Sequence, residues 1–377
     1  MTTLHPLHEL SLDQLRQRTS IKWRAHPEDV LPLWVAEMDV PLADAVVEAV
    51  TEAMRRGDTG YSAGTGYAEA YADFARDRWG WGFEVDQATI VPDVMLGIVE
   101  MLKLLTAPGD AVVVNSPVYP PFYEFVEHLD RKVVEAPLDA EHRIDFEVLE
   151  DRFRGAAAYL LCSPHNPTGT VHTRGELERV TALAEEYGVR VVADEIHAPL
   201  VHDEQRHHPF LSVAGGDRAI TLLSASKAWN LAGLKSAIAV AGPAAVDDLR
   251  RMPEEATHGA SHLGAIAHIA ALRDGRDWLD ALIADLDENR RQLAELLTAH
   301  MPKVRYRPPA ATYLAWLDCR DLGLGDDPAA AFLENGKVAL NSGLPFGTGG
   351  AGHARLNLAT TPEILTEAVN RMAQNLD

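Results

Sequence analysis

The chain has 377 residues, enough for two domains or one large α/β domain. With 47% apolar residues, 27 glycines and 22 prolines, its composition is that of a globular protein, which excludes a disordered, collagenous or coiled-coil chain. Acidic residues (56) outnumber lysine and arginine (34), and a net charge of −22 repels nucleic acid and anionic membranes. We therefore expect a small-molecule partner.

The cysteine content and the hydropathy pattern bear on cellular location. Two cysteines, Cys162 and Cys319, are too few for a disulfide framework and favour a reducing compartment. The start of the sequence lacks the basic and apolar regions of a signal peptide, and no run of ~18 apolar residues predicts a membrane span. We expect a cytoplasmic protein with no membrane partner.

In chain order, the hydrophobic pattern predicts one large domain between two terminal segments. Residues 1–43 hold four prolines and little helical periodicity, so we expect an extended arm. Residues 44–275 begin with a helix that ends at Gly57 and continue with short apolar runs and helical patterns, as in a mostly parallel sheet. Residues 276–377 start with a long helix and end in an α+β pattern. The sequence therefore predicts an α/β fold with a large domain (44–275) and a smaller α+β domain made from both chain ends (1–43 and 276–377).

Polar residues follow each of the expected parallel strands, which are residues 111–114, 159–162, 189–193 and 219–223. In an open parallel sheet, reactive groups lie beyond the carboxyl ends of the strands. The segments that follow the strands are Asn115 to Tyr119, Ser163 to Gly169, Asp194 to His197, and Ser224 to Lys227. We expect an aromatic ring, an amide, a carboxylate, hydroxyls and a lysine to converge at one edge of the sheet.

Lys227 stands between a buried strand and the serines Ser224 and Ser226. A lone lysine is nearly always a solvated surface residue. In this position, however, the amine is placed to form an imine with an aldehyde cofactor while the hydroxyls bind the cofactor's phosphate. The pattern predicts pyridoxal 5'-phosphate (PLP) as the cofactor.

The other strand-end residues suit the same cofactor. A carboxylate such as Asp194 at about 4 Å stabilises a proton on the pyridine nitrogen by ~4 kcal/mol at an effective dielectric constant of ~20, or ~3 pKa units. Asn166 is suited to donate to the ring oxygen, and Tyr119 to stack on the ring face. Taken singly, Asn166 is also typical of a turn and Tyr119 of a packed loop.

These residues together resemble the fold-type I, aspartate aminotransferase superfamily of PLP enzymes, over nearly the whole chain. The resemblance is carried by Asn166-Pro167-Thr168-Gly169, Asp194 and Ser224-Ala225-Ser226-Lys227. Four further stretches look like the MalY/PatB branch of cystathionine β-lyases and other carbon–sulfur lyases. They are residues 31–39, 194–197, 313–318 and 355–357. The resemblance implies the fold-type I architecture.

The resemblance also implies roles for individual residues. Lys227 would be the Schiff-base lysine, Asp194 the partner of the pyridine nitrogen, Asn166 the partner of the ring oxygen and Tyr119 the stacking ring. Phosphate contacts would come from the side chains of Ser224, Ser226 and Lys235, and from the N–H groups of Val94 and Met95, which are expected at a helix start that favours an anion. His197 would support the cofactor site, with a satisfied buried histidine as the alternative. Tyr61 matches the tyrosine that family members lend to the neighbouring subunit's phosphate, which implies a homodimer.

Arg355 matches the family's arginine that binds the substrate α-carboxylate. A planar guanidinium holds a carboxylate through two hydrogen bonds, and a surface salt bridge is the alternative. Asn357 shares the strand face of Arg355. We expect Arg355, Trp34 and Asn357 to contact an amino-acid substrate.

The expected activity is β-elimination at a carbon–sulfur bond of cystathionine or an L-cysteine S-conjugate, which yields a thiol, pyruvate and ammonia. Lys227 would remove the Cα proton as general base. An aminotransferase would use the same residues up to this step, so that activity remains an alternative. A catalytically silent relative that serves as a binding or regulatory protein is a third.

Three residues depart from the family pattern. Asp93 and Ala311 stand where glycine is common, and His172 where tryptophan is common. Asp93 bears on the backbone at the phosphate-binding helix, and the three together leave substrate preference open.

Other motifs have a simpler interpretation. Gly347 to Gly352 matches the dinucleotide fingerprint G-x-G-x-x-G, but it precedes an expected strand near 354–359 and is interpreted as a mobile loop. His202, His207 and His208, with Asp203 and Glu204, have no metal-ligand spacing and are interpreted as a solvated loop. His258 and His262 lack a third ligand. We expect no metal site.

Overall fold

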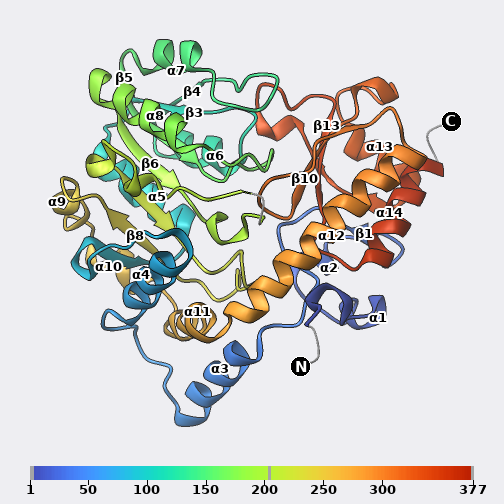
Figure 1. The fold of residues 1–377 in the computed structure, drawn as a ribbon, viewed down its shortest axis with the longest axis horizontal. Coiled ribbons are helices and arrows are strands. Elements are labelled where there is room, and N and C mark those ends of the chain that lie inside the picture. The colour runs from blue at the N-terminus through green and yellow to red at the C-terminus, as the bar shows by residue number, and fades with distance from the viewer. Residues whose placement is uncertain (1–3, 203–204, 375–377) are drawn as a thin grey trace. The chain divides into compact units, whose positions relative to one another are not determined.

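The computed structural model describes residues 4–202 and 205–374 (Figure 1). The chain forms two compact units. The smaller contains the described residues up to Pro41, His165–Thr170 and the described residues from Asp277 on, and the larger contains Leu42–Pro164 and Val171–Arg276. In the described ranges, no helix is both long enough and apolar enough to cross a lipid bilayer.

A seven-stranded sheet forms the centre of the larger unit, with strand order β2-β8-β7-β6-β5-β3-β4. Its strands are β2 (Ala88–Val91), β3 (Ala111–Val114), β4 (Lys132–Glu135), β5 (Ala156–Cys162), β6 (Arg190–Asp194), β7 (Ile220–Leu223) and β8 (Ala237–Ala241). The five strands from β4 to β7 are mutually parallel, whereas β8 is antiparallel to both β7 and β2. The expected α/β fold with a mostly parallel sheet is confirmed.

Helices cover both faces of this sheet, because its strands are apolar on both sides. Val112 and Val114 pack with α5 and α6, whereas Val113 packs with α7 and α8 on the opposite face. The helices of the larger unit are α3 (Asp44–Arg56), α4 (Gly66–Trp79), α5 (Val94–Leu105), α6 (Pro121–His128), α7 (Phe146–Phe153), α8 (Arg174–Tyr187), α9 (Val246–Leu249), α10 (Glu254–His258) and α11 (His262–Asp274). As expected, α3 ends at Gly57, which adopts the left-handed conformation (φ +71°) that stops a helix.

The smaller unit combines antiparallel strands with helices. Its four-stranded sheet has the order β12-β13-β10-β9, and β1 pairs in parallel with β11. The strands are β1 (Leu31–Pro32), β9 (Arg305–Tyr306), β10 (Leu314–Asp318), β11 (Val338–Ala339), β12 (Asn341–Ser342) and β13 (His353–Asn357). The helices are α1 (Leu12–Leu15), α2 (Ile21–Arg24), α12 (Arg276–His300), α13 (Pro328–Gly336) and α14 (Pro362–Gln374). The long orange helix in Figure 1 is α12.

The N-terminal arm is less extended than expected, since it contains α1 and α2. Helix α1 is one turn long and is stabilised by a capping box in which Ser11 and Gln14 each satisfy the other's backbone N–H. A helix of a single turn leaves no periodic apolar pattern in the sequence, so α1 could not be predicted from hydrophobic periodicity.

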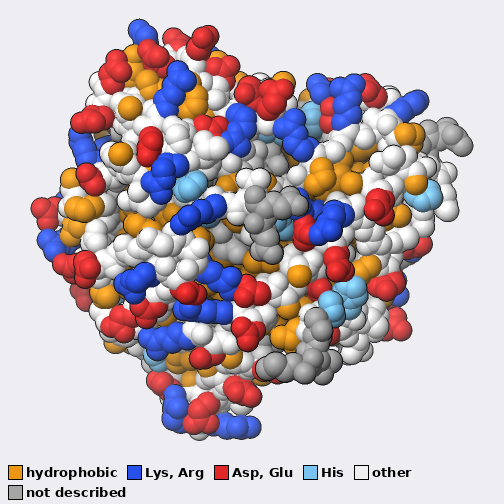
Figure 2. All heavy atoms as spheres, in the orientation of Figure 1, with side chains coloured by type: hydrophobic (Ala, Val, Ile, Leu, Met, Phe, Trp, Pro, Cys, Tyr) orange, Lys and Arg blue, Asp and Glu red, His pale blue; other side chains and the backbone are white. Residues whose placement is uncertain are grey.

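Surface charges are mixed in sign on the face drawn in Figure 2. Lysine and arginine side chains alternate with acidic ones there, and hydrophobic side chains are scattered among them. On this face no basic patch gathers that would attract a phosphate backbone.

Candidate active site

Asp194 and Lys227 lie at the carboxyl edge of the sheet in the larger unit. Asp194 is the last residue of β6, where it lies opposite Cys162 of β5 and Leu222 of β7. Lys227 lies in the turn that follows β7, and its charge acts on the Asp194 carboxyl. The parallel strands thus bring together the carboxylate and the amine that the sequence singled out.

The Asp194 carboxyl is buried. The residue is 4% exposed, and within the described part of the chain its carboxyl accepts a hydrogen bond from the Ile196 N–H at 3.0 Å. Burial raises its pKa from 3.8 to about 7, against the opposing effects of that hydrogen bond and of Lys227. A buried acid of this kind fits a cationic N–H donor such as a protonated pyridine nitrogen.

We predict that this carboxyl makes the cofactor-free protein less stable as the pH rises. Between pH 3.8 and about 7 the folded state keeps the Asp194 proton that the unfolded chain has lost. The free energy of unfolding should therefore fall by about 4 kcal/mol over that range. Urea unfolding of the cofactor-free protein and of Asp194→Asn at several pH values measures the difference, because other titrating groups are common to both. If the free energy of unfolding depends on pH equally in the two proteins, the raised pKa of Asp194 is contradicted.

The turn that carries Lys227 is held by its own backbone and serines. Ser224 is buried and donates its hydroxyl to the Ser236 carbonyl at 2.8 Å, and the Ser226 N–H donates to Ser224 Oγ at 3.1 Å. The N–H groups of Trp229 and Leu231 close the turn on the carbonyls of Ala225 and Ser226, at 3.1 and 2.7 Å. The lysine is therefore attached to a well-defined segment.

The start of α5 is where the sequence predicts a phosphate-binding site, and an acidic residue, Asp93, caps the helix there. Asp93 caps the helix through the Leu96 N–H at 2.8 Å, and its other oxygen pairs with Lys235 Nζ at 2.8 Å. Among the described residues, nothing accepts from the N–H of Val94 or Met95. These N–H groups and Lys235 fit a phosphate, although Asp93 already engages Lys235. The φ of Asp93 is −158°, an extended conformation that requires no glycine.

Three other expected cofactor residues lie in the same unit. Tyr119 is partly buried after β3 and meets Phe122 edge-on with ring centres 6.1 Å apart. His197 is buried just after β6, at the start of a short 3-10 helix. Tyr61, between α3 and α4, is 84% exposed. Its exposure leaves the hydroxyl open to a partner molecule.

Arg355 and Asn166 meet within the smaller unit. Arg355, on β13, is 3% exposed and donates from Nη1 to Asn166 Oδ1 at 3.0 Å. Its guanidinium carbon lies 5.2 Å from the ring centre of Phe346. Because the amide oxygen of Asn166 accepts from Arg355, the amide N–H₂ is the end that points elsewhere, as a donor to a ring oxygen requires. Arg355 is therefore buried and does not form the surface salt bridge that was the alternative.

The turn around Asn166 depends on one glycine. Gly169 has φ +67°, and a Cβ there would lie 2.3 Å from Pro309 Cβ and 2.9 Å from the Ala311 carbonyl oxygen. Its carbonyl also accepts from the N–H groups of Ala310 and Ala311, each at 3.1 Å. Both the conformation and the close approach require glycine at this position.

Side chains from β13 and from Tyr313 hold the segment 34–37 by hydrogen bonds to its carbonyl oxygens. Arg355 Nη2 donates to the Trp34 carbonyl at 3.3 Å, and the Tyr313 hydroxyl donates to the Ala36 carbonyl at 3.1 Å. Asn357 Nδ2 donates to the carbonyls of Val35 and Glu37, both at 2.7 Å, while its Oδ1 accepts from the Ala359 N–H.

Contact between Asn357 and substrate stays a prediction, and the structure shows that its side chain also has a structural role. Its amide is fully buried, and its donors and acceptor are engaged by the backbone. We infer that it positions the 34–37 segment. Trp34 lies in that segment, partly buried, with its ring edge-on to His26 at 5.8 Å.

A buried ion pair that the sequence reading missed supports the same segment. Lys22 Nζ lies 2.8 Å from Asp39 Oδ2 and donates to the Glu37 carbonyl at 2.9 Å, and both side chains are at most 2% exposed. Trp23 Nε1 also donates to Asp39. Asp39 lies in a stretch that carries the family resemblance, but no spacing rule singles out Lys22.

The histidine cluster is not the solvated loop expected from sequence. His202 and His207 are buried, at 1% and 2% exposure, and His207 Nε2 lies 3.4 Å from the buried carboxylate of Glu195. Trp79 packs against the His207 ring at 4.9 Å between ring centres, a contact that local sequence could not reveal. Asp203 and Glu204 lie outside the described residues.

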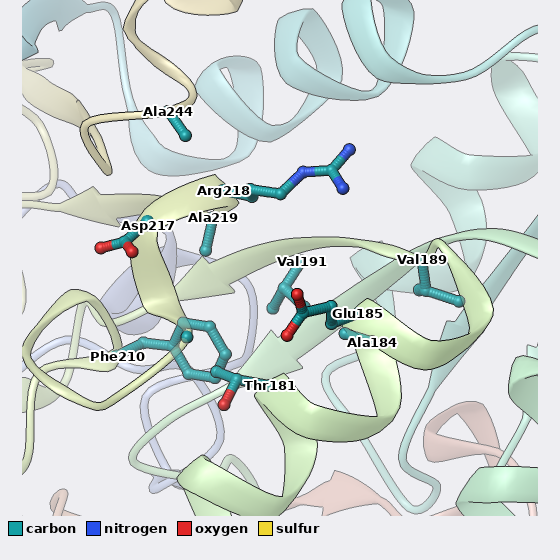
Figure 3. Close-up of a pocket in the computed structure, with 11 residues that line it drawn as sticks. Thr181, Ala184, Glu185, Val189, Val191, Phe210, Asp217, Arg218, Ala219 and Ala244 are labelled. Atoms are coloured by element: carbon teal, nitrogen blue, oxygen red, sulfur yellow. The ribbon is translucent and has the colours of Figure 1, made fainter.

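Other potential ligand sites in the described residues are formed by side chains outside the predicted set. Among the described residues, one group has the arrangement of metal ligands, and it comprises His5, His8 and Asp285. There His5 already pairs with Asp285 at 2.9 Å. A cavity of about 240 Å³ lies at the opposite ends of β6 and β7, beside Arg218 and Phe210, and no predicted site residue lines it (Figure 3). The 347–352 segment precedes β13 as a loop and does not open a helix.

Comparison with known proteins decides the family. The family described as "Aminotransferase class I and II" matches residues 28–372. The chain belongs to the class I and II aminotransferase family. The predicted family and its fold-type I architecture are thereby confirmed.

Relatives within this family carry lyase names. A Mycobacterium leprae protein named "Putative cystathionine beta-lyase" is 55% identical over 99% of both chains. The cystathionine beta-lyase of Corynebacterium glutamicum is 37% identical over 97% of this chain and 99% of that protein. Cystalysin from Treponema denticola, whose crystal structure contains PLP, superposes with a TM-score of 0.91 and 26% identity over 99% of both chains. The chain is thus an enzyme of a PLP-dependent family, as predicted.

Proposed function

We propose that this chain is a PLP-dependent carbon–sulfur β-lyase that cleaves cystathionine or another L-cysteine S-conjugate to a thiol, pyruvate and ammonia. The observation that carries the proposal is the buried carboxyl of Asp194, on which the charge of Lys227 acts at the same edge of the sheet. The lyase names of the relatives favour β-elimination over amino transfer.

Each site residue has a physical role in this proposal. When bound, PLP supplies a sink for the electron pair released at the substrate Cα. Asp194 keeps a proton on the pyridine nitrogen, and Lys227 Nζ removes the Cα proton as general base. Asn166 donates to the ring oxygen, and Arg355 binds the substrate α-carboxylate through two parallel hydrogen bonds.

The remaining residues hold the cofactor and shape the substrate site. Tyr119 would supply an aromatic face for the cofactor ring, and His197 would support the cofactor site. Phosphate contacts come from Ser224, Ser226, Lys235, and the N–H groups of Val94 and Met95. Trp34 borders the substrate from a segment whose carbonyl is held by Arg355.

The products distinguish the candidate reactions. We expect the PLP-loaded enzyme to convert L-cystathionine to free thiol, pyruvate and ammonia in equal amounts, without an added keto acid. An aminotransferase, the second candidate and the activity after which the family is named, would instead need a keto acid and release no thiol. L-alanine with the same keto acid serves as a control that only an aminotransferase consumes. Absence of turnover in the loaded protein would favour a non-catalytic role.

We further propose a cytoplasmic homodimer. Tyr61, Met54 and Leu96 are exposed at 84%, 55% and 45%, so these apolar side chains are available for burial against a second copy. In that dimer Tyr61 would reach the neighbouring subunit's phosphate. The two cysteines are free and buried, consistent with a reducing compartment. The molecular mass in solution tests the dimer.

A further inference from the structure

A buried pair of polar side chains, one from each of two helices, contacts the turn that carries Lys227. Tyr67 of α4 places its hydroxyl 2.8 Å from Nδ1 of His268 on α11. The two rings meet edge-on, with centres 5.4 Å apart. Tyr67 is 4% exposed and His268 is fully buried. A polar pair at this depth needs a structural or functional reason, because burying it costs solvation free energy.

The Tyr67 hydroxyl also contacts the lysine turn directly. The N–H of Ala225, two residues before Lys227, points at the Tyr67 oxygen at 3.4 Å. Ala225 is itself fully buried. Through this contact Tyr67 links the turn to the packed helices α4 and α11.

Both members of the pair are uncharged. Burial lowers the pKa of His268 to about 3, so its ring is neutral, and burial raises the pKa of Tyr67, so its hydroxyl keeps its proton. The Tyr67 oxygen accepts from the Ala225 N–H, and its hydroxyl shares a hydrogen bond with Nδ1 of His268 whose direction is set by the tautomer of the ring.

We infer that Tyr67 and His268 position the turn that presents Lys227, and that they tune the reaction without touching substrate. This inference rests on the proposed function. Without the Tyr67 hydroxyl, the buried Ala225 N–H loses the acceptor that it has among the described residues. An unsatisfied buried N–H is costly, so we expect the turn to shift and to move Lys227 with it. Displacements on the order of 1 Å at a reacting group cost about 10²-fold in rate.

The test compares two tyrosines on one helix. Tyr67→Phe removes the linking hydroxyl, whereas Tyr71→Phe, one turn along α4, removes a fully buried hydroxyl that has no hydrogen-bond partner among the described residues. In the PLP-loaded enzyme we expect Tyr67→Phe to lower kcat roughly 10- to 100-fold with KM changed less than about twofold. It should also shift the pH at which the yellow absorbance of the loaded enzyme changes. Tyr71→Phe should leave both quantities at their wild-type values.

The His268 variants keep the test decisive if Tyr67→Phe does not fold. His268→Asn retains an acceptor near Nδ1 and should keep most of the activity, whereas His268→Leu should match the loss expected for Tyr67→Phe. Wild-type kcat and spectral titration in both Tyr67→Phe and His268→Leu would overturn the inference. So would equal losses in His268→Asn and His268→Leu. A wild-type protein that binds no PLP would instead overturn the proposed function itself.

Discussion

Replacing Lys227 by alanine is expected to abolish turnover of L-cystathionine while the fold persists. General-base catalysis alone contributes about 10²- to 10⁴-fold, and the same amine is the expected point of attachment of the cofactor, so the loss should exceed ~10⁴-fold in kcat. The rate of pyruvate release measures the effect. Borohydride reduction followed by mass analysis should find the cofactor on Lys227 in the wild-type protein and nowhere on the variant.

A matched lysine variant separates this effect from the general loss of an amine. Lys103 lies on α5 in an exposed ion pair with Glu100, and its side chain is 48% exposed. Lys103→Ala should retain wild-type turnover and thermal stability, since exposed ion pairs contribute little. Turnover in Lys227→Ala equal to that of Lys103→Ala would remove Lys227 from the mechanism.

Replacing Asp194 by asparagine is expected to lower kcat/KM by about 10³-fold, because an amide cannot hold the proton on the pyridine nitrogen. The figure follows from the ~4 kcal/mol that a carboxylate at about 4 Å contributes. The PLP-loaded variant should still bind the cofactor, so the loss appears in the rate and not in the amount of bound PLP.

The control for Asp194 lies at the other end of the sheet. Asp217 precedes β7 and is exposed beside the cavity in Figure 3, which no predicted site residue lines. Asp217→Asn removes the same charge from the protein and should leave kcat/KM within about twofold of wild type. If both variants lose activity equally, net charge and not the position of Asp194 is responsible.

Local pattern was sufficient for the elements that create the sheet edge. The apolar run at 111–114 coincides with β3, and the run at 189–193 differs from β6 by one residue at each end. Short apolar runs predict such strands well, because a strand that is covered on both faces must be apolar throughout. The strand β8 was missed. No α-helix separates it from β7, and the chain returns antiparallel, a connection that apolar content alone does not reveal.

The order of residues along the chain was enough to predict which side chains gather at the sheet edge. Parallel strands place the residues that follow them at one edge, so the positions of Asp194 and Lys227 in the chain predicted their proximity. The pairs of polar groups that are buried together could not be predicted in this way. They are Lys22 with Asp39, Tyr67 with His268, and His207 with Glu195, together with the contacts of Asn357 to the carbonyls of Val35 and Glu37. Each of these contacts joins residues that are distant in sequence, and the three-dimensional packing that brings them together is not encoded in any local periodicity.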